Sequence, residues 1–577
     1  MTGNDSRNSH NSAKDMAFDW SQYYASDAPT KLDFDGSGGI AGTIEAACHR
    51  FAHLPAVTAM GATLTYKQLD RLANRFASFL QNKLGLKKGD RLAIMMPNVL
   101  QFPIVFLAAQ KIGVVCVNTN PLYTPREMRH QFSDSGVKAI VIMDLFLDKL
   151  EEIIKETDIK HVVSTNVADQ LPVWKGLVVK AGMHFKKMIP QHNLRNVIPF
   201  RSALSSGEER KLVKPDLAID DIALLQYTGG TTGVSKGAML THRNILANMQ
   251  QIRHAAWGEI DEGSETVLTA LPLYHIFALT VNFLSFLAMG EHLILVPKPV
   301  PIANTVEIFK KYKITVMTGV NTLYNSLCND KEFKAMGVRT IKFALAGGMA
   351  LQESVAQAWQ LITGNRIVEG FGLTEASPVT HVNPLSQPPR KGSIGVPVLG
   401  TDAIVADENG VALPVGERGE LLIRGPQVMA GYWQRPDETA KTVKGDWLWT
   451  GDIARVDEDG YFFIVDRKKD MILVSGFNVY PNEIEDVIAM HPKVLEAAVI
   501  GLPDNTSGES VRAYVVPKDA SLTVDELRDW CRDQLTGYKR PRSFEIRQVL
   551  PKSNVGKILR RELRDEALSS RQAKGKA

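Results

Sequence analysis

Cysteine is scarce in this chain of 577 residues. The four cysteines lie far apart, and no two have the spacing of a CxxC motif (Cys48, Cys116, Cys328, Cys531). Their spacing excludes a disulfide framework and a cysteine-based zinc site. We therefore expect a protein of the reducing cytoplasm.

The chain also lacks a marked excess of charge of either sign. Its 67 basic and 63 acidic side chains leave a net charge of +4, which gives no reason to expect a nucleic acid partner. The composition, 44% hydrophobic and 23% charged, is typical of a globular protein. A chain of this length is too long for one hydrophobic core, so we expect several domains.

Two segments lack what a secretory or membrane protein would need. Met1 to Asp15 has no apolar core, so it is not a signal peptide, and we predict a disordered tail over residues 1–30. Thr266 to Gly290 has no charged side chain in 25 residues, which is long enough to cross a bilayer. Polar residues such as His275 and Asn282 interrupt it, so we predict a buried strand, turn and helix instead.

The hydrophobic pattern predicts an α/β fold in two parts. Arg91–Met96 and Val114–Asn118 are predicted as buried strands, and Leu69–Leu84 as a helix. Continued alternation predicts a large N-terminal domain (31–465) of several α/β layers with parallel sheets. A strand meander from Gly419 is interpreted as its small β-barrel-like part. The charge cluster Asp466–Asp470 marks the boundary with a small α+β C-terminal domain (466–577).

A loop rich in glycine and hydroxyl groups follows the strand-like run Ile222–Gln226. Tyr227–Gly237 holds four glycines, four Ser or Thr residues and one lysine. Glycines let backbone N–H groups approach phosphate oxygens, while hydroxyls and a lysine add donors and charge. It is not a Walker A loop, because Lys236 is followed by Gly237 and a predicted strand rather than by a helix. We interpret it as a triphosphate cradle; the structural alternative is a surface hairpin.

Several motifs together resemble those of the acyl-adenylate-forming family, over about residues 40–565. The loop resembles that family's phosphate-binding signature, and the other motifs occur in the family's order. They are Leu64–Tyr66 (early core motif), Leu271–His275 (substrate gate), Ala346–Gly348 and Glu369–Glu375 (adenine segments), Trp449–Asp452 and Asp466–Arg467 (ribose segments) and Pro551–Lys557 (C-terminal catalytic loop).

The resemblance implies a two-step reaction. A carboxylate attacks the α-phosphate of ATP to give acyl-AMP and pyrophosphate, and the thiol of coenzyme A then displaces AMP. Two anions meet in the first step, so positive charge is needed, and the implied source is Lys557. Thr231 and Glu375 are implied to hold Mg²⁺, and His275 to gate the acyl site. On spacing alone Lys557 would be an exposed lysine, Glu375 a helix-start carboxylate and His275 a core histidine.

The resemblance also implies a nucleotide site. Asp452 would accept the ribose hydroxyls and Phe371 would pack on adenine. The C-terminal domain is implied to be mobile, turning about Lys469 to bring the region of Gly476 to the thioester channel. The implied cofactor-binding residues are Tyr227, Thr228, Gly229, Gly230, Thr231, Thr232, Gly233, Ser235, Lys236, Gly237, Gly347, Gly348, Glu369, Gly370, Phe371, Gly372, Thr374, Asp452, Arg467, Lys469 and Gly476.

Within the family, Trp447–Ile453 and Ser475–Pro481 resemble the signature of bacterial long-chain fatty acyl-CoA synthetases, with a departure at Trp449, where His is usual. The implied substrates are a long-chain fatty acid, ATP and coenzyme A. The uncharged stretch Thr266–Gly290 fits an alkyl tunnel, because each buried methylene contributes about 0.8 kcal/mol. The alternatives are a ligase for a medium-chain or aryl acid and a catalytically silent fatty-acid-binding regulator.

One segment has the composition of a membrane-surface site. Gln170–Gly207 has no Asp or Glu, but six basic residues alternate with apolar ones. We weigh docking on an anionic membrane, as a peripheral protein on its inner face, against a solvated loop, and both stay open. A homodimer also remains an open expectation.

Overall fold

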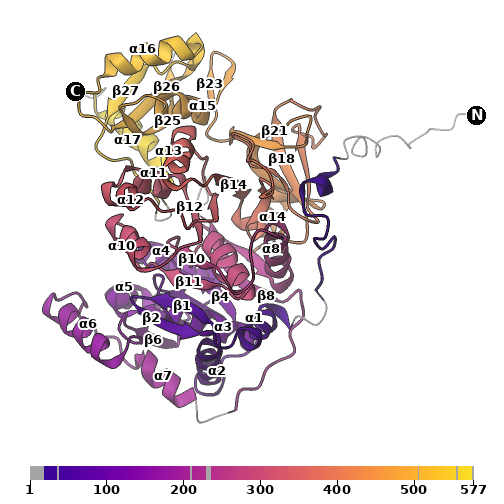
Figure 1. Cartoon of the computed structure of the whole chain (residues 1–577). Helices are drawn as coiled ribbons and strands as arrows, with labels where there is room; N and C mark the ends of the chain where they lie inside the picture. Colours follow the sequence, from indigo (N-terminus) through magenta and orange to yellow (C-terminus); the bar gives the residue numbers. More distant parts are fainter. Residues whose placement is uncertain are drawn as a thin grey trace, which may run out of the picture.

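The computed structural model describes residues 18–34, 38–207, 211–228, 235–504, 506–553 and 556–574. In this part of the chain the strands form four sheets. Two large sheets and the helices around them make up the lower part of the molecule in Figure 1, and the C-terminal residues lie above them. This arrangement confirms the α/β class expected from the sequence.

The first sheet is eight-stranded, in the order β19-β9-β8-β4-β3-β5-β6-β7. Its strands from β3 to β8 run parallel, whereas β9 is antiparallel to β8. The predicted phosphate loop therefore connects the two strands of the β8–β9 hairpin. The strands are β3 (Arg91–Met95), β4 (Val115–Asn118), β5 (Ala139–Met143), β6 (His161–Thr165), β7 (Ile198–Pro199), β8 (Ile222–Thr228), β9 (Lys236–Thr241) and β19 (Gly431–Tyr432). Its helices are α2 (Tyr66–Asn82), α3 (Gln101–Lys111), α4 (Pro125–Ser135), α5 (Leu147–Ile153), α6 (Val173–Phe185) and α7 (Phe200–Ser206).

The second sheet is nine-stranded and mainly parallel, in the order β16-β15-β14-β13-β12-β10-β11-β1-β2. Trp359 packs edge-on against Tyr324 at a centroid distance of 4.9 Å, in the core between this sheet and its outer helices. The strands are β1 (Pro55–Ala59), β2 (Ala62–Thr65), β10 (Thr266–Thr269), β11 (His292–Leu295), β12 (Val316–Gly319), β13 (Phe343–Ala346), β14 (Ile367–Gly372), β15 (Val379–Val382) and β16 (Val396–Pro397). The helices are α10 (Ala303–Lys311), α11 (Asn321–Asn329), α12 (Lys331–Met336) and α13 (Glu353–Thr363).

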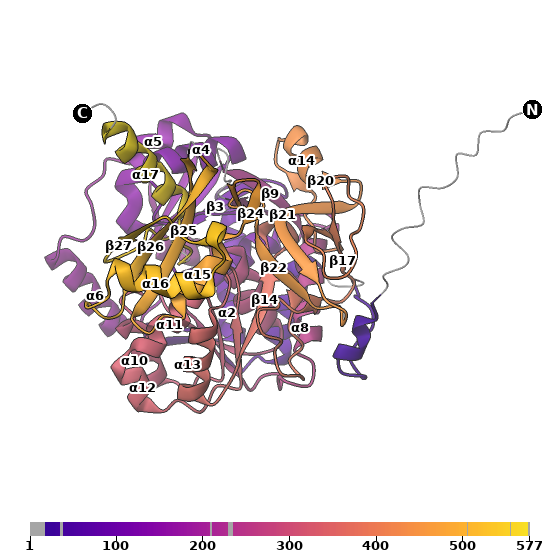
Figure 2. The same ribbon diagram turned by 90° about the horizontal axis from the view of Figure 1, so that it is seen from above.

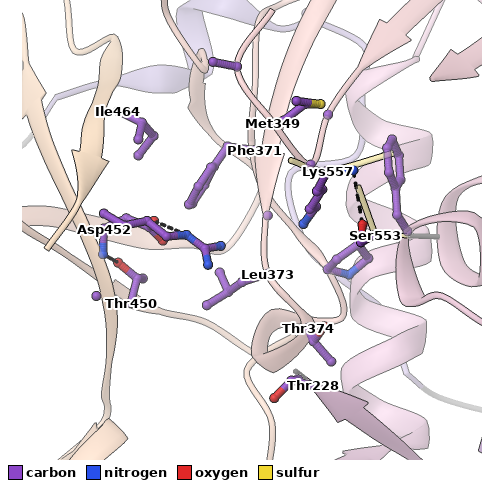
Figure 3. A pocket seen from close by; sticks show the side chains of 18 of the residues that line it. Thr228, Met349, Phe371, Leu373, Thr374, Thr450, Asp452, Ile464, Ser553 and Lys557 are labelled. Atoms are coloured by element: carbon purple, nitrogen blue, oxygen red, sulfur yellow. Dashed lines mark hydrogen bonds and ion pairs between the residues drawn. The ribbon is translucent and has the colours of Figure 1, made fainter. Parts of the chain in front are cut away.

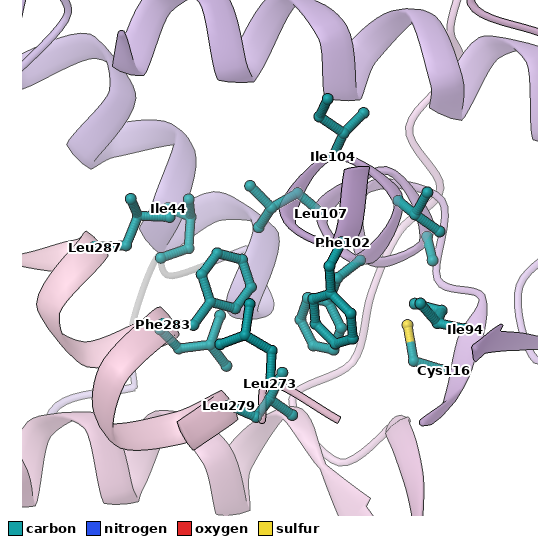
Figure 4. Packing of buried hydrophobic residues seen from close by; sticks show 14 of the residues in the cluster. Ile44, Ile94, Phe102, Ile104, Leu107, Cys116, Leu273, Leu279, Phe283 and Leu287 are labelled. Atoms are coloured by element: carbon teal, nitrogen blue, oxygen red, sulfur yellow. The ribbon is translucent and has the colours of Figure 1, made fainter. Parts of the chain in front are cut away.

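The helices between the two sheets form the main core. They are α1 (Gly39–Arg50), α3, α8 (His242–Ala255), the π-helix η5 (Ala278–Ser285) and α9 (Phe286–Ala288). Phe283 of η5 packs edge-on against Phe102 of α3 at 6.5 Å (Figure 4). The uncharged stretch Thr266–Gly290 is thus β10, a turn, η5 and α9, which confirms the buried strand, turn and helix. No helix in the described ranges combines the length and apolarity needed to cross a bilayer.

The predicted strand meander is a five-stranded antiparallel sheet. It contains β17 (Asp402–Ala406), β18 (Gly419–Arg424), β20 (Val443–Lys444), β21 (Trp447–Val456) and β22 (Phe462–Arg467), with α14 (Pro436–Thr442) leading into it. β22 ends at Arg467, inside the charge cluster expected to separate the domains. The C-terminal part follows, with its own apolar cluster between its sheet and helices.

The C-terminal part covers one end of the nine-stranded sheet, above α11 and α13 in Figure 1, and Figure 2 shows it from above. Its elements are β23 (Ile472–Val474), β24 (Phe477–Val479), α15 (Pro481–Ala489), β25 (Val494–Asp504), β26 (Gly508–Pro517), α16 (Val524–Gln534), β27 (Ser543–Ile546) and α17 (Arg560–Lys574).

The prediction of a disordered tail through residue 30 is wrong for residues 18–30. This segment holds the helix η1 (Trp20–Tyr23), and the Trp20 indole donates a hydrogen bond to the carbonyl of Gly460 (3.1 Å). Tyr23 donates to the carbonyl of Asp459 (2.7 Å). These aromatic side chains anchor the segment. The prediction extended the polar character of the first fifteen residues too far along the chain and overlooked them.

Candidate functional site

A cavity of about 2690 Å³ opens where the two large sheets, the β21–β22 sheet and the C-terminal part meet. It brings together side chains that are far apart in the sequence, including Thr228, Phe371, Asp452 and Lys557 (Figure 3). Predicted site residues from the loop flanks, the adenine segments and the ribose segments line this one space.

Lys557 reaches the cavity from the C-terminal part. Its backbone N–H donates to the Ser553 hydroxyl (3.1 Å), and the Ser553 N–H donates to the Lys557 carbonyl (2.7 Å), so the two residues are held together. Thr322 of α11 donates to the carbonyl of Gly556 (3.3 Å), so this turn is docked on the N-terminal domain. Burial, with the nearby charge of Arg467, lowers the pKa of Lys557 to about 8.

Asp452 lies opposite, on β21. It is buried, and its Oδ1 is 3.4 Å from Nε of the exposed Arg467. Its N–H donates to the Thr450 hydroxyl (3.1 Å), which fixes the backbone at this bend. Burial raises the pKa of Asp452, while Arg467 and Lys557 oppose the rise. A buried carboxylate facing a cavity has acceptor capacity to offer a ligand hydroxyl.

Glu375 is the candidate metal ligand in the described residues. It lies in the short helix η6 (Thr374–Ala376) after β14, and Tyr432 donates to its carboxylate (2.7 Å). The described ranges contain no cluster of three or more His, Cys, Asp or Glu side chains that would hold a metal by themselves. Mg²⁺ bound to a nucleotide needs only one or two carboxylates besides phosphates and waters, so a lone Glu375 fits it.

The centre of the predicted phosphate loop lies outside the described residues, and with it Gly229, Gly230, Thr231, Thr232 and Gly233. Its flanks, Thr228 and Ser235, line the cavity.

The hairpin under this loop is held by Tyr227. A Cβ on Gly237 would lie 3.1 Å from the Tyr227 ring, so glycine lets the ring pack against β9. The Tyr227 hydroxyl donates to Asp134 (2.7 Å). Tyr227 lines the cavity and also supports the hairpin, so its predicted role in cofactor binding stays a prediction.

Lys236 lines the cavity, but its ammonium is already engaged. It forms an ion pair with Glu438 of α14 and lies 5.3 Å from the centroid of the Tyr432 ring. Glu438 also pairs with Lys441 at 2.7 Å. A phosphate would compete with Glu438 for Lys236.

The predicted adenine segments lie at the ends of β13 and β14, which are neighbouring parallel strands. The cavity is therefore lined by Gly347, Gly348, Gly370, Gly372 and Thr374. A Cβ on Gly372 would lie 2.1 Å from the Pro378 carbonyl oxygen, so only glycine fits there. Phe371 projects toward Asp452 and Ile464 in Figure 3.

Glu369 precedes these residues on β14. Its carboxyl accepts the Leu351 N–H (3.3 Å), and burial, reinforced by the charge of Asp486, raises its pKa to about 8.

His275 lies at the inner wall of the cavity, where its Nδ1 accepts the Phe277 N–H (3.3 Å). Burial and the charge of Lys557 lower the pKa of His275 to about 3, so it is neutral near pH 7.

Two other predicted residues, Lys469 and Gly476, differ in their position relative to the cavity. Lys469 lines the cavity rim, whereas Gly476 stands apart from the cavity lining, in the exposed turn between β23 and β24 (φ +83°).

Part of the cavity lining, here called the apolar limb, consists of apolar side chains. Only part of this lining comes from the uncharged stretch that predicted an alkyl tunnel, through Ile276, Phe277, Val281 and Phe286. The other walls are residues that sequence reasoning missed, from α8, β13 and the β15–β16 region (Ile252, Ala255, Ala256, Phe343, Leu385, Val398). Their only sequence signal is the amphipathic pattern of α8, which is also what an ordinary core helix shows.

The chain matches the AMP-binding enzyme family over residues 44–433 and the AMP-binding enzyme C-terminal domain over residues 483–557. It is 50% identical over 549 residues to a long-chain-fatty-acid–CoA ligase of Escherichia coli, which covers 95% of this chain and 98% of that protein. It is 35% identical over 519 residues to a feruloyl-CoA synthase of Amycolatopsis, covering 89% of this chain and 96% of that protein.

Solved structures agree with the fold. An anthranilate CoA ligase in complex with anthranoyl-AMP has a TM-score of 0.82 at 25% identity, covering 95% of this chain and 99% of its own. MatB from Rhodopseudomonas palustris with bound ATP has a TM-score of 0.75 at 27% identity, with coverages of 91% and 98%. The cavity, its loop flanks and these matches agree: the chain belongs to the AMP-binding enzyme family.

Proposed function

We propose that this protein is an AMP-forming ligase that joins a long-chain fatty acid to coenzyme A. The observation that carries the proposal is one cavity whose lining brings together Lys557, Asp452, His275 and the apolar limb. The 50% identity to a long-chain-fatty-acid–CoA ligase supports the substrate class. The limb is walled by aliphatic and phenyl groups, which suits an alkyl chain.

In the first step, a carboxylate oxygen attacks the α-phosphorus of ATP and pyrophosphate leaves. Lys557 would hold the carboxylate and the α-phosphate together, since its buried ammonium interacts more strongly than it would in water. Asp452 would accept the ribose hydroxyls, and Phe371 would pack on adenine. Magnesium, when bound, neutralises triphosphate charge; Glu375 would hold it, together with Thr231, which lies outside the described residues.

In the second step, the sulfur of coenzyme A attacks the acyl carbon and AMP leaves. This step needs Lys557 to withdraw, and we propose a rotation of the C-terminal domain about Lys469. The rotation would turn the face around Gly476 toward the cavity. That face carries an exposed pair of stacked rings, Phe477 and Tyr538, with ring centroids 4.7 Å apart. The flat adenine base of coenzyme A can stack on such a pair.

The deciding experiment is AMP release from the purified protein with acids of increasing chain length and with ferulate, each with and without coenzyme A. We expect AMP release that needs coenzyme A and rises with chain length over the medium-chain range. A preference for ferulate over every fatty acid would contradict the proposal. Absence of turnover with all acids would favour the binding regulator.

We also propose that α6 docks on anionic membranes, from which fatty acids are taken up. Trp174, Leu177 and Phe185 are 66%, 65% and 88% exposed on this helix, which projects from the molecule in Figure 1. Exposed apolar groups beside lysines combine hydrophobic insertion with attraction to anionic lipid.

The test is co-sedimentation with vesicles of phosphatidylglycerol and phosphatidylcholine. Changing the lysines of this region to glutamine (Lys175, Lys180, Lys186, Lys187) should reduce bound protein at least tenfold, at about 1 kcal/mol per lysine. The matched control changes four exposed lysines of α10 and α12 instead (Lys310, Lys311, Lys331, Lys334). Equal losses for both variants, or none, would contradict docking through α6.

A further inference from the structure

We propose that the N-terminal segment 18–34, here called the strap, backs part of the apolar limb from outside and sets the longest chain that the site accepts. The inference rests on the proposed function, because it assigns the length limit of that same site. The sequence predicted disorder for residues 18–30 of the strap and assigned no role to the segment.

The strap crosses the outside of the molecule from the β21–β22 sheet to α8, along one flank in Figure 1. Trp20 fixes its start on the turn before β22. Its end is fixed on α8 by two hydrogen bonds with Gln250, whose side chain accepts the Asp33 N–H (2.8 Å) and donates to the Asp33 carbonyl (2.5 Å). Leu32 packs beside Gly400 between these anchors, where a Cβ on Gly400 would lie 3.5 Å from a Leu32 methyl.

Tyr24 connects the strap to the surroundings of the limb. Its ring packs on the His254 ring at a centroid distance of 4.5 Å, and its hydroxyl donates to the Pro397 carbonyl (3.2 Å). His254 is buried and adjoins Ala255 in sequence, and Pro397 adjoins Val398; both neighbours line the apolar limb. Tyr24 therefore contacts the residues next in sequence to two separate parts of the lining and ties these two parts together.

This placement has a consequence for chain length. The lining residues that follow His254, Ala255 and Ala256, have small side chains, so the stacked rings of His254 and Tyr24 limit how far this part of the wall can yield. Removing the Tyr24 ring leaves a void next to His254, into which the wall can relax. Extra methylenes then find room, whereas chains that already fit gain nothing.

The experiment compares kcat/KM across saturated fatty acids from medium to very long chains, for the wild type and Tyr24→Ala. For acids longer than the wild-type optimum, we expect the ratio of kcat/KM to that of a medium-chain acid to rise by up to about fourfold per added methylene, the factor that corresponds to about 0.8 kcal/mol. Tyr24→Phe keeps the ring and should keep the wild-type profile. Filling the limb from inside with Ala255→Phe should shift the profile to shorter acids.

The matched control is Tyr23→Ala. It removes the neighbouring ring of the same strap, but that ring packs on Tyr461 (5.1 Å), away from α8. We expect an unchanged length profile for this variant. A Tyr24→Ala variant that loses activity in equal proportion at every length, or a Tyr23→Ala variant with the same shift, would overturn the role of the strap. If the wild type converted no fatty acid, the proposed function itself would fail.

Discussion

Lys557 of the C-terminal domain lies directly against Gly348 of the N-terminal domain. A Cβ on Gly348 would lie 3.4 Å from the lysine Cε and 3.9 Å from Nζ. Gly348 also has a φ of +80°, a conformation that glycine adopts without strain. The glycine thus provides the backbone shape beside the lysine and leaves the space next to its side chain open.

Gly348→Ala should therefore impair the first half-reaction. The new methyl group would lie in van der Waals contact with Lys557 and restrict how the lysine adjusts to its substrates. Losing its charge-assisted contact would cost about 1.5–3 kcal/mol, or about tenfold to over a hundredfold in the rate of acyl-AMP formation. Rapid-quench measurement of acyl-AMP checks this. Gly416→Ala is the control, because Gly416 has a φ of +86° with nothing within 4 Å of its Cβ position. Equal losses in both variants would mean that backbone strain alone is responsible.

The pH dependence of adenylation should follow Lys557. Its pKa of about 8 in the free protein means that the ammonium is charged below pH 8 and is lost as the pH rises above it. We expect kcat/KM for ATP in adenylation to fall about tenfold per pH unit on the alkaline side. Lys557→Arg keeps its charge there, so its residual activity should show no such fall. A fall that persists in this variant would assign the titration to another group.

Asp452→Asn should weaken nucleotide binding through the ribose. Hydrogen bonds to a charged acceptor contribute about 1.5–3 kcal/mol, so we expect at least tenfold weaker binding of ATP by calorimetry. The affinity of the wild type should fall by a similar factor when ATP is replaced by a deoxyribose analogue. The affinity of the variant should change little on the same replacement, because its contact with the ribose hydroxyls is already lost. Additive losses from both changes would place Asp452 elsewhere.

Glu438→Gln should strengthen pyrophosphate or ATP binding if Lys236 contacts phosphate in the complex. The neutral side chain no longer competes for the ammonium, so KM for ATP should fall by about threefold, within the range of an exposed ion pair. Lys236→Met should raise KM. An unchanged KM in both variants would leave the Lys236–Glu438 pair a purely structural contact.

The sequence predicted the elements whose signals are local. The hairpin β8–β9 followed from a strand, a glycine-rich loop and a second strand, and β13 was predicted at its observed bounds, Phe343–Ala346. The pairing of Glu375 with Tyr432, 57 residues later, was not predictable, because it depends on β19 joining β9 at the sheet edge.

The acyl limb was only partly predictable for a similar reason. Ala255 and Leu385 are ordinary apolar residues whose neighbours along the chain say nothing of a cavity. They meet because α8 packs on η5 and β15 pairs with β14. The strap was missed because its aromatic anchors follow a polar stretch that dominated the local composition. In both cases the position of the residues depends on packing between segments far apart in the sequence, which local sequence patterns do not reveal.

The most direct test separates the two half-reactions in Lys557→Ala. One assay measures acyl-AMP formation from ATP and a long-chain fatty acid, and the other measures thioester formation from supplied acyl-AMP and coenzyme A. We predict that adenylation falls by at least a hundredfold, as for the loss of one electrostatic stabiliser in a preorganised site, while thioester formation stays within about threefold of wild type. Wild-type adenylation in this variant, or an equal loss in both assays, would contradict the assignment of Lys557 to the first step.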